Sequence, residues 1–199
     1  VRLTLYATSE RSGIESLVDA AEAGKIATRL GQGESGAVIS NALWRINQIY
    51  DAFRSSVAAD RVQRLTGAES SEGRARARAA DLILATPTVD LGYNFDRPGK
   101  RRQSIDFLYF DARFGDELVQ RIGRAGRVLG KPVTDCPSDV VGLVPDEIYQ
   151  RFQPYDGQRL ARPELARLAA ELPHRHNLFA YLRSGAIGEA FLPIFHLHG

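Results

Sequence analysis

Two arginines spaced three residues apart are the side chains of this sequence best suited to chemistry. Arg124 and Arg127 end the run 120–127 (QRIGRAGR), in which Gly123 precedes the first of them. On a helix, residues three apart lie on one face, and a planar guanidinium can bind phosphate oxygens through two hydrogen bonds where lysine presents only a point charge. The run therefore indicates phosphate binding, and the alternative is a solvated, arginine-rich helix end.

A second run, 83–95 (ILATPTVDLGYNF), is an apolar strand that leads directly into a turn. Thr86 and Thr88 can cap this turn and donate their hydroxyl groups to a nucleic-acid phosphate, while Gly92 lets the backbone approach a ligand closely. In doubly wound sheets, ligands bind where strands end and loops enter helices. The run thus predicts a binding turn, with an ordinary capped strand end as the alternative.

The hydrophobic pattern predicts strands that alternate with helices, and these elements must position both runs. We expect strands at 2–7, 37–40, 62–65, 81–85, 105–110 and 139–144, and helices at 14–30, 43–53, 72–79, 115–124, 145–152, 162–171, 177–184 and 187–197. Such alternation predicts an α/β fold with right-handed crossovers and a mainly parallel sheet. We expect the sheet domain to occupy residues 1–131, and a connector strand with a small helical extension to occupy residues 132–199.

The composition is that of a globular protein, with 44% hydrophobic and 25% charged residues among 199. No apolar run approaches the ~20 residues that a membrane helix needs, so we expect no membrane contact. A lone Cys136 fits a reducing cytoplasm. The histidine pairs at 174/176 and 196/198 have no cluster of further ligands beside them, so we expect no metal site.

Together the two runs resemble motifs V and VI of the superfamily 2 nucleic-acid helicases. Motif V has the form A-T-x-x-x-E/D-x-G-x-D and matches residues 85–94, and motif VI has the form Q-x-x-G-R-x-x-R and matches residues 120–127. Both belong to the second RecA-like domain of these enzymes, so the resemblance implies a three-layer RecA-like fold. Within the superfamily, the chain looks most like the CRISPR-associated helicases of type I systems, in particular the type I-D form. That likeness rests on residues 88–92 (TVDLG), 142–145 (GLVP) and 177–182 (NLFAYL).

The resemblance implies a role for each matched residue. Gln120 and Arg124 would lie near the phosphates of ATP, and Arg127 would act as the arginine finger. Nucleotide binding is implied for four further residues: Asp90, Gly92, Asn94 and Gly123. Asn94 stands where the family commonly has Asp, and an amide keeps the hydrogen bonding but loses the charge. We expect both arginines to project from the rim of the sheet, at its strand ends, toward a nucleotide held by another domain.

Nucleic-acid contact is expected where other strands end. Thr66 and Gly67 follow one predicted strand, where such helicases hold the backbone of the tracked strand, and Asn41 occupies the analogous place one strand earlier. Each of these could instead cap a helix. The basic segment 96–103 (DRPGKRRQ) is expected to be a solvated loop, with DNA contact as the alternative. Core packing is expected for most aromatic residues: Tyr50, Phe53, Phe107, Tyr109 and Phe110. For Trp44, both core packing and base stacking are kept as alternatives.

The chain contains neither a G-x-x-x-x-G-K-S/T loop nor an acidic Walker B strand, and the segment 31–36 (GQGESG) is followed by alanine where such a loop requires lysine. We therefore expect it to be the C-terminal half of an ATP-dependent motor, whose first RecA-like domain holds most of the ATP and Mg²⁺. The implied partners are that domain, single-stranded DNA and an RNA-guided surveillance complex. The alternatives are a catalytically silent interaction module and a superfamily 2 helicase acting on RNA or in DNA repair.

Overall fold

The computed structural model describes residues 1–9, 17–54, 61–67, 70–87, 95, 99–128 and 130–173. Its strands are β1 (Arg2–Ala7), β2 (Gly36–Ile39), β3 (Val62–Leu65), β4 (Leu82–Ala85), β5 (Phe107–Asp111) and β6 (Asp139–Val144). Its helices are α1 (Ala20–Gly31), α2 (Leu43–Arg54), α3 (Ser71–Ala79), α4 (Gly115–Ile122), α5 (Asp146–Phe152) and α6 (Arg162–Ala170), with a 3-10 turn over Gln153–Tyr155.

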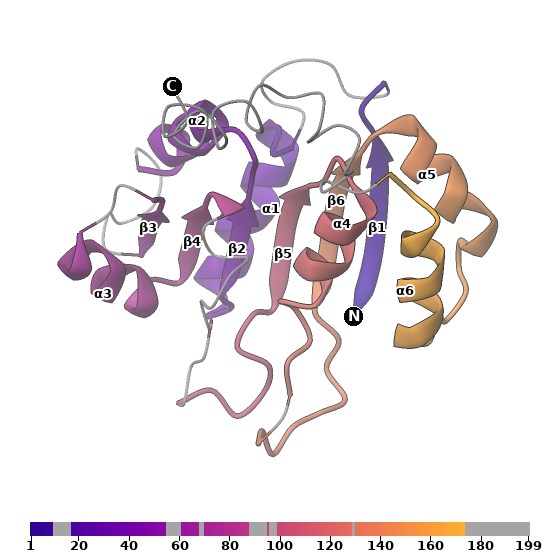
Figure 1. Cartoon of the computed structure of the whole chain (residues 1–199). Coiled ribbons are helices and arrows are strands. Elements are labelled where there is room, and N and C mark those ends of the chain that lie inside the picture. The colour runs from indigo at the N-terminus through magenta and orange to yellow at the C-terminus, as the bar shows by residue number, and fades with distance from the viewer. Residues whose placement is uncertain are drawn as a thin grey trace, which may run out of the picture.

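The strands form one six-stranded sheet in the order β1-β6-β5-β2-β4-β3. Every neighbouring pair in it is parallel. All the strands therefore end at the same edge, which we call the carboxyl edge and which lies at the top of Figure 1. We call the opposite edge, where the strands begin, the amino edge. Each helix that connects one strand to the next therefore runs from the carboxyl edge back to the amino edge.

Helices cover both faces of this sheet and give it three layers (Figure 1). On one face, Ile26 of α1 and Ile46 of α2 are buried with Val38 of β2. On the other face, Leu118 of α4 is buried with Ile39 of β2, and residues of α3, α5 and α6 join the same cluster. Successive strand residues point to opposite faces, and every position of β2, β4 and β5 is buried because both faces are covered. The α/β three-layer fold expected from the sequence is confirmed.

The strand expected at residues 139–144 is present as β6, but it does not act as a connector. It lies inside the sheet, paired with β1 on one side and with β5 on the other. Its residues alternate between buried and half-buried positions before ending in a buried run. The sheet therefore includes residues on both sides of the predicted boundary at 131, because β1 reaches the rest of the sheet only through β6.

Two helix boundaries differ from the prediction by two residues or more. α1 begins at Ala20 instead of residue 14, because the side chain of Asp19 accepts a hydrogen bond from the Glu22 backbone N–H at 2.8 Å and caps the helix there. Leu17 and Val18, whose apolar character extended the predicted helix, are buried ahead of that cap. α4 ends at Ile122, two residues earlier than expected. The helices predicted at 177–184 and 187–197 lie outside the described residues.

Candidate functional site

The motif VI run lies at the amino edge, beyond the end of α4. Gly123 caps the helix, and Gly126 has a φ of 65°, a conformation that glycine adopts readily and other residues rarely do. The chain has therefore left the helix before it reaches Arg124 and Arg127. The expected common helical face does not form, because glycine favours termination at both positions. Arg127 is exposed, Arg124 is half-buried, and Gln120 is exposed on the last turn of α4.

Hydrogen bonds hold this loop against the starts of two strands. The backbone N–H of Gly126 donates to Ser138 Oγ at 3.0 Å, and that hydroxyl donates to the carbonyl of Ile105 at 2.6 Å. Ser138 is fully buried and precedes β6, whereas Ile105 precedes β5. Arg127 adds a hydrogen bond from its Nε to the carbonyl of Gly123 at 3.0 Å. The loop is thus fixed in place at the amino edge.

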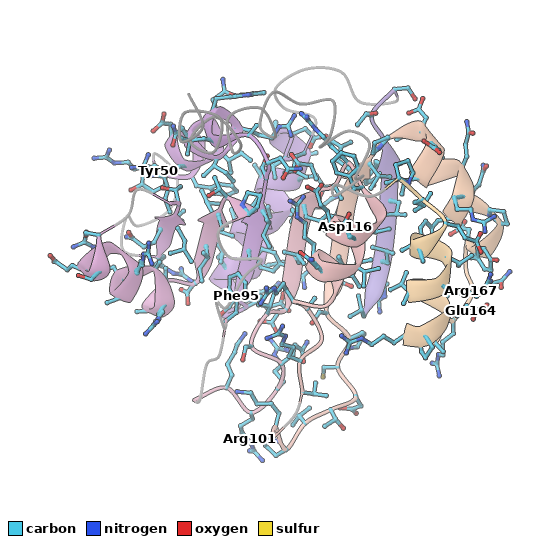
Figure 2. The ribbon with its side chains drawn as sticks, viewed as in Figure 1. Tyr50, Phe95, Arg101, Asp116, Glu164 and Arg167 are labelled. Atoms are coloured by element: carbon cyan, nitrogen blue, oxygen red, sulfur yellow. The ribbon has the colours of Figure 1, made fainter. Side chains whose placement is uncertain are left out.

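A cluster of charged residues accompanies this loop at the amino edge. Asp106 is 2% exposed and forms ion pairs with Lys100 and with Arg102, whose Nε lies 3.0 Å from the carboxylate. The backbone N–H of Ser35 donates to the same carboxylate at 2.8 Å. These contacts fasten residues 99–103 to the sheet, so this part of the expected solvated loop is anchored. Arg101 still lies at the exposed tip, as Figure 2 shows.

Arg29 also belongs to this amino-edge cluster and contacts β5 and β6 from α1. Arg29 of α1 forms ion pairs with Glu34 and with Asp139 of β6, the latter at 2.9 Å. Its guanidinium also lies 4.8 Å from the ring centre of Phe107 in β5. The cluster contains cations and carboxylates in similar number, so much of its charge is compensated within the domain.

The predicted nucleic-acid residues gather at the opposite, carboxyl edge. Strand register aligns Ile39, Ala85 and Leu65 on β2, β4 and β3. The residues that follow them, Ser40, Thr86 and Thr66, therefore stand in one row at that edge, with neighbouring strands ~4.8 Å apart. Thr66 is buried and Thr86 is half-buried, while Gly67 is exposed in a turn. The structure thus brings Thr66, Thr86 and Asn41 to one edge and the motif VI arginines to the other.

Asn41 belongs to a buried polar network at the carboxyl edge. Its side-chain oxygen accepts a hydrogen bond from Arg121 Nη2 at 2.7 Å, and its Nδ2 donates to Glu117 at 3.2 Å. Its backbone N–H donates to Asp111 Oδ1 at 2.8 Å. Both ends of the Asn41 amide are therefore engaged within the domain. This arrangement holds the β2–α2 connection against α4.

Asp111, the last residue of β5, is the centre of this network. Its carboxylate accepts a hydrogen bond from Ser40 Oγ at 2.6 Å, forms an ion pair with Arg45 and lies 3.3 Å from Arg121 Nη1. Arg121 is completely buried and Asp111 is 8% exposed. A buried carboxylate with several donors is strongly held, because losing one of them leaves a desolvated charge. We call Ser40, Asn41, Arg45, Asp111, Glu117 and Arg121 the carboxyl-edge network.

Sequence reasoning did not identify the carboxyl-edge network beyond Asn41. The spacing of Glu117 and Arg121, four residues apart, was the available signal, but it is equally typical of an exposed helical pair. Ser138 also went unnoticed, because nothing local to a serine reveals that it will meet a loop 12 residues away.

The perturbed ionisable groups lie where α1 meets β5. The Tyr109 hydroxyl donates to the Glu22 carboxylate, which also accepts a hydrogen bond from Lys25 at 2.8 Å. Burial raises the pKa of Glu22, but the hydrogen bonds from Lys25 and Tyr109 outweigh burial and leave that pKa below its ordinary value. Burial, followed by the hydrogen bond to Glu22, raises the pKa of Tyr109 far above its ordinary value. The bond to Glu22 raises the pKa of Lys25.

Four predicted site residues lie outside the described residues: Thr88, Asp90, Gly92 and Asn94. The chain re-enters the described part at Phe95, which is buried and which Figure 2 places toward the amino edge. Within the described ranges, no group of three His, Cys, Asp or Glu side chains is arranged to hold a metal ion. Among the helices that the structure describes, none is long and apolar enough to span a membrane.

Comparison with known proteins identifies the fold. No protein-family model matches the sequence, and no curated protein matches it. Domain 2 of the DEAD-box helicase Mss116p, solved bound to an RNA duplex, is similar with a TM-score of 0.54 and 10% identity, over 81% of this chain and 62% of that one. The C-terminal domain of the DEAD-box protein Dbp5 is similar with a TM-score of 0.48 and 16% identity, over 85% of this chain and 96% of that one. The UvsW helicase from bacteriophage T4 is similar with a TM-score of 0.45 and 15% identity, over 83% of this chain and 51% of that one.

At these identities the similarity concerns the fold alone, and the two TM-scores below 0.5 carry no weight. The likeness to Mss116p domain 2 confirms the RecA-like fold that motifs V and VI imply. This chain matches 62% of the length of that structure. The activity of a whole helicase therefore comes to it only as a proposal.

Proposed function

We propose that this chain is the second RecA-like domain of an ATP-dependent nucleic-acid helicase or translocase of superfamily 2. One observation carries the proposal: in a RecA-like fold, the motif VI run 120–127 forms a fixed loop at a sheet edge and ends in the exposed Arg127. A loop that is anchored through Ser138 and Gly126 keeps an exposed guanidinium near one position. Such preorganisation is what stabilising a transition-state charge requires.

In this proposal, Gln120, Arg124 and Arg127 face the phosphates of ATP, which is held together with Mg²⁺ mainly by a first RecA-like domain. The donor set fits this role, since guanidinium and amide groups donate several hydrogen bonds to phosphate oxygens. Arg127 acts as the arginine finger and opposes the charge that develops on the transferred phosphoryl group. Four further residues complete the nucleotide site: Asp90, Gly92, Asn94 and Gly123.

The nucleic-acid backbone runs along the carboxyl edge in the same proposal. Thr66, Thr86 and Thr88 donate hydroxyl groups to its phosphates, and Gly67 allows close approach. Because Arg121 and Glu117 occupy its amide, we propose that Asn41 shapes the β2–α2 connection instead of binding a phosphate through its side chain.

The test is ATP hydrolysis by the complete protein, with both RecA-like domains, in the presence of single-stranded DNA. Arg127→Ala should lower turnover by about 10³- to 10⁵-fold while leaving the unfolding midpoint unchanged. Arg167→Ala is the matched control, because Arg167 is an exposed arginine on α6, outside the motif VI run (Figure 2). Hydrolysis retained by the Arg127 variant at the level of this control would refute the assignment.

A narrower proposal follows from motif likeness alone: the motor tracks or unwinds single-stranded DNA in CRISPR interference, beside an RNA-guided surveillance complex. It rests partly on residues 88–92 and 177–182, which lie outside the described residues. The alternatives are a superfamily 2 helicase that acts on RNA or in DNA repair, and a catalytically silent interaction module. Asn94 favours the last of these, because the charge that the family commonly carries there is missing. DNA-stimulated hydrolysis that depends on Arg127 would exclude it.

A further inference from the structure

Trp44 is an exposed aromatic residue at the carboxyl edge. It lies in the first turn of α2, and 48% of it is exposed, which is unusual for the largest apolar side chain. The helix beneath it is firmly packed, since Ile46, Ile49 and Phe53 are buried against the sheet. A single exposed apolar residue is common on protein surfaces and means little alone. Two features of its surroundings, the neighbouring Arg45 and the nearby strand ends, distinguish Trp44 from such a residue.

A fixed cation lies over the Trp44 ring. The guanidinium carbon of Arg45 is 5.1 Å from the ring centre, a distance typical of a cation–π contact. Arg45 is itself held by the ion pair with Asp111, and its Nη1 lies 3.5 Å from Ser40 Oγ. The buried carboxyl-edge network therefore fixes the group that supports the ring. Nearly half of the Trp44 side chain nevertheless faces solvent, so the indole is both supported and accessible.

The position of Trp44 relative to the strand ends is equally specific. α2 begins only four residues after Ile39, the last residue of β2, and Ile39 is aligned with Ala85 and Leu65. The tryptophan therefore lies at the carboxyl edge, next to the Ser40 end of the row formed by Ser40, Thr86 and Thr66. A nucleic-acid backbone held along that row would carry its bases past the indole.

We infer that Trp44, supported by Arg45, is a stacking platform for a base of single-stranded nucleic acid bound along the carboxyl edge. This inference rests on the proposed function, because it needs the nucleic-acid backbone at that edge. Base–aromatic stacking tolerates every sequence, since each base has a π-face, and it suits a protein that tracks along a strand. A duplex cannot use the platform, because its bases are already stacked on one another. Trp44 thus favours single strands over duplexes.

Two measurements test the inference on the protein. Trp44 is the only tryptophan of the 199-residue chain. The difference in intrinsic tryptophan fluorescence between the protein and its Trp44→Phe variant therefore reports on this residue. Titration with an oligo(dT) strand should quench that fluorescence. In fluorescence anisotropy with a labelled oligo(dT), Trp44→Ala should raise Kd about 5- to 100-fold, whereas Trp44→Phe, which keeps a π-face, should lose less.

Leu43→Ala is the matched control, because Leu43 is the neighbouring residue and is equally exposed at 50%, but has no π-face. Its Kd should stay within about twofold of the wild type. An oligonucleotide of equal length built from abasic nucleotides supplies the second control. It should bind the wild-type protein and the Trp44→Ala variant with equal Kd, because it carries phosphates but no bases to stack.

The outcomes separate the inference from the proposed function. If the wild-type protein binds oligo(dT) but the Trp44→Ala variant binds it equally well, the stacking inference is overturned and the proposed function stands. The same holds if Leu43→Ala loses as much affinity, or if the Trp44 effect persists with the abasic strand. Absence of any binding by the wild-type protein, with either strand, would overturn both.

Discussion

Replacing Arg121 with methionine is expected to destabilise the protein strongly, although the residue lies in a run that resembles a functional motif. Arg121 is completely buried, and its guanidinium contacts Asn41 at 2.7 Å and Asp111 at 3.3 Å. Hydrogen bonds that involve a charged group contribute about 1.5–3 kcal/mol each, so losing two would cost about 3–6 kcal/mol. Methionine fills much of the space left by the arginine, which keeps the cavity small.

The lower part of that range is expected, because Asp111 keeps three other donors: the Ser40 hydroxyl, the Arg45 guanidinium and the Asn41 backbone N–H. We therefore expect Arg121→Met to lower the free energy of unfolding by about 3 kcal/mol. For a domain of this size, the loss corresponds to about 6–12 °C in Tm. Urea titration followed by circular dichroism measures the free energy, and a thermal melt measures Tm.

The neighbouring residue provides the control for this prediction. Gln120→Met introduces the same side chain at an exposed position, where the change should stay within about 0.5 kcal/mol. A double-mutant cycle with Asp111→Asn should give a coupling energy of at least about 1 kcal/mol, since the two residues touch. A loss below about 1 kcal/mol for Arg121→Met, or one equal to that of Gln120→Met, would show that the carboxyl-edge network does not hold α4 in place.

Two further predictions concern backbone conformation and pH. Gly126→Ala should lower the free energy of unfolding by about 1–2 kcal/mol, because φ is 65° there and an added Cβ would lie 2.7 Å from a side-chain atom of Val1. Gly24→Ala is the control at a helical position with open space, and it should raise the free energy of unfolding by about 0.5–1 kcal/mol in the same urea titrations. A loss of stability in both variants would contradict this reasoning. Above about pH 10 the unfolded chain releases a tyrosine proton that folded Tyr109 keeps, so stability falls as pH rises. Tyr109→Phe should show a shallower fall in unfolding free energy between about pH 9 and pH 11, and equal slopes would refute the assignment.

Much of the fold was predictable because its signals are local. The strands β1, β3 and β6 occupy the residues that the hydrophobic pattern predicted. The fully buried strands β2, β4 and β5 were predicted to within two residues, since short apolar runs bounded by polar residues mark them. The end of α4 was predicted less well. The three-residue spacing of Arg124 and Arg127 favours a longer helix, whereas Gly123 and Gly126 favour an earlier end, and in the structure the glycines prevail.

The candidate site was predictable only in part. Thr66, Thr86 and Asn41 were correctly expected at strand ends, and they do share one edge, because parallel strands all end on the same side. The motif VI arginines were also expected at strand ends, but α4 carries the chain back across the sheet before they are reached. The amino-edge position follows from helix length and direction, which a motif does not contain.

The sequence by itself indicates where the strands and helices lie, whereas the pairing order of the strands, which only the folded chain has, decides which side chains meet. Apolar periodicity and glycine placement act over a few neighbouring positions, so they indicate where the strands, the helices and the turn at Gly126 lie without specifying any long-range contact. The burial of Arg121 depends instead on β2 pairing with β5, which brings Asn41 to a residue 80 positions away. A charged side chain is stable there only because the folded chain supplies its partners at the same time as it removes the water.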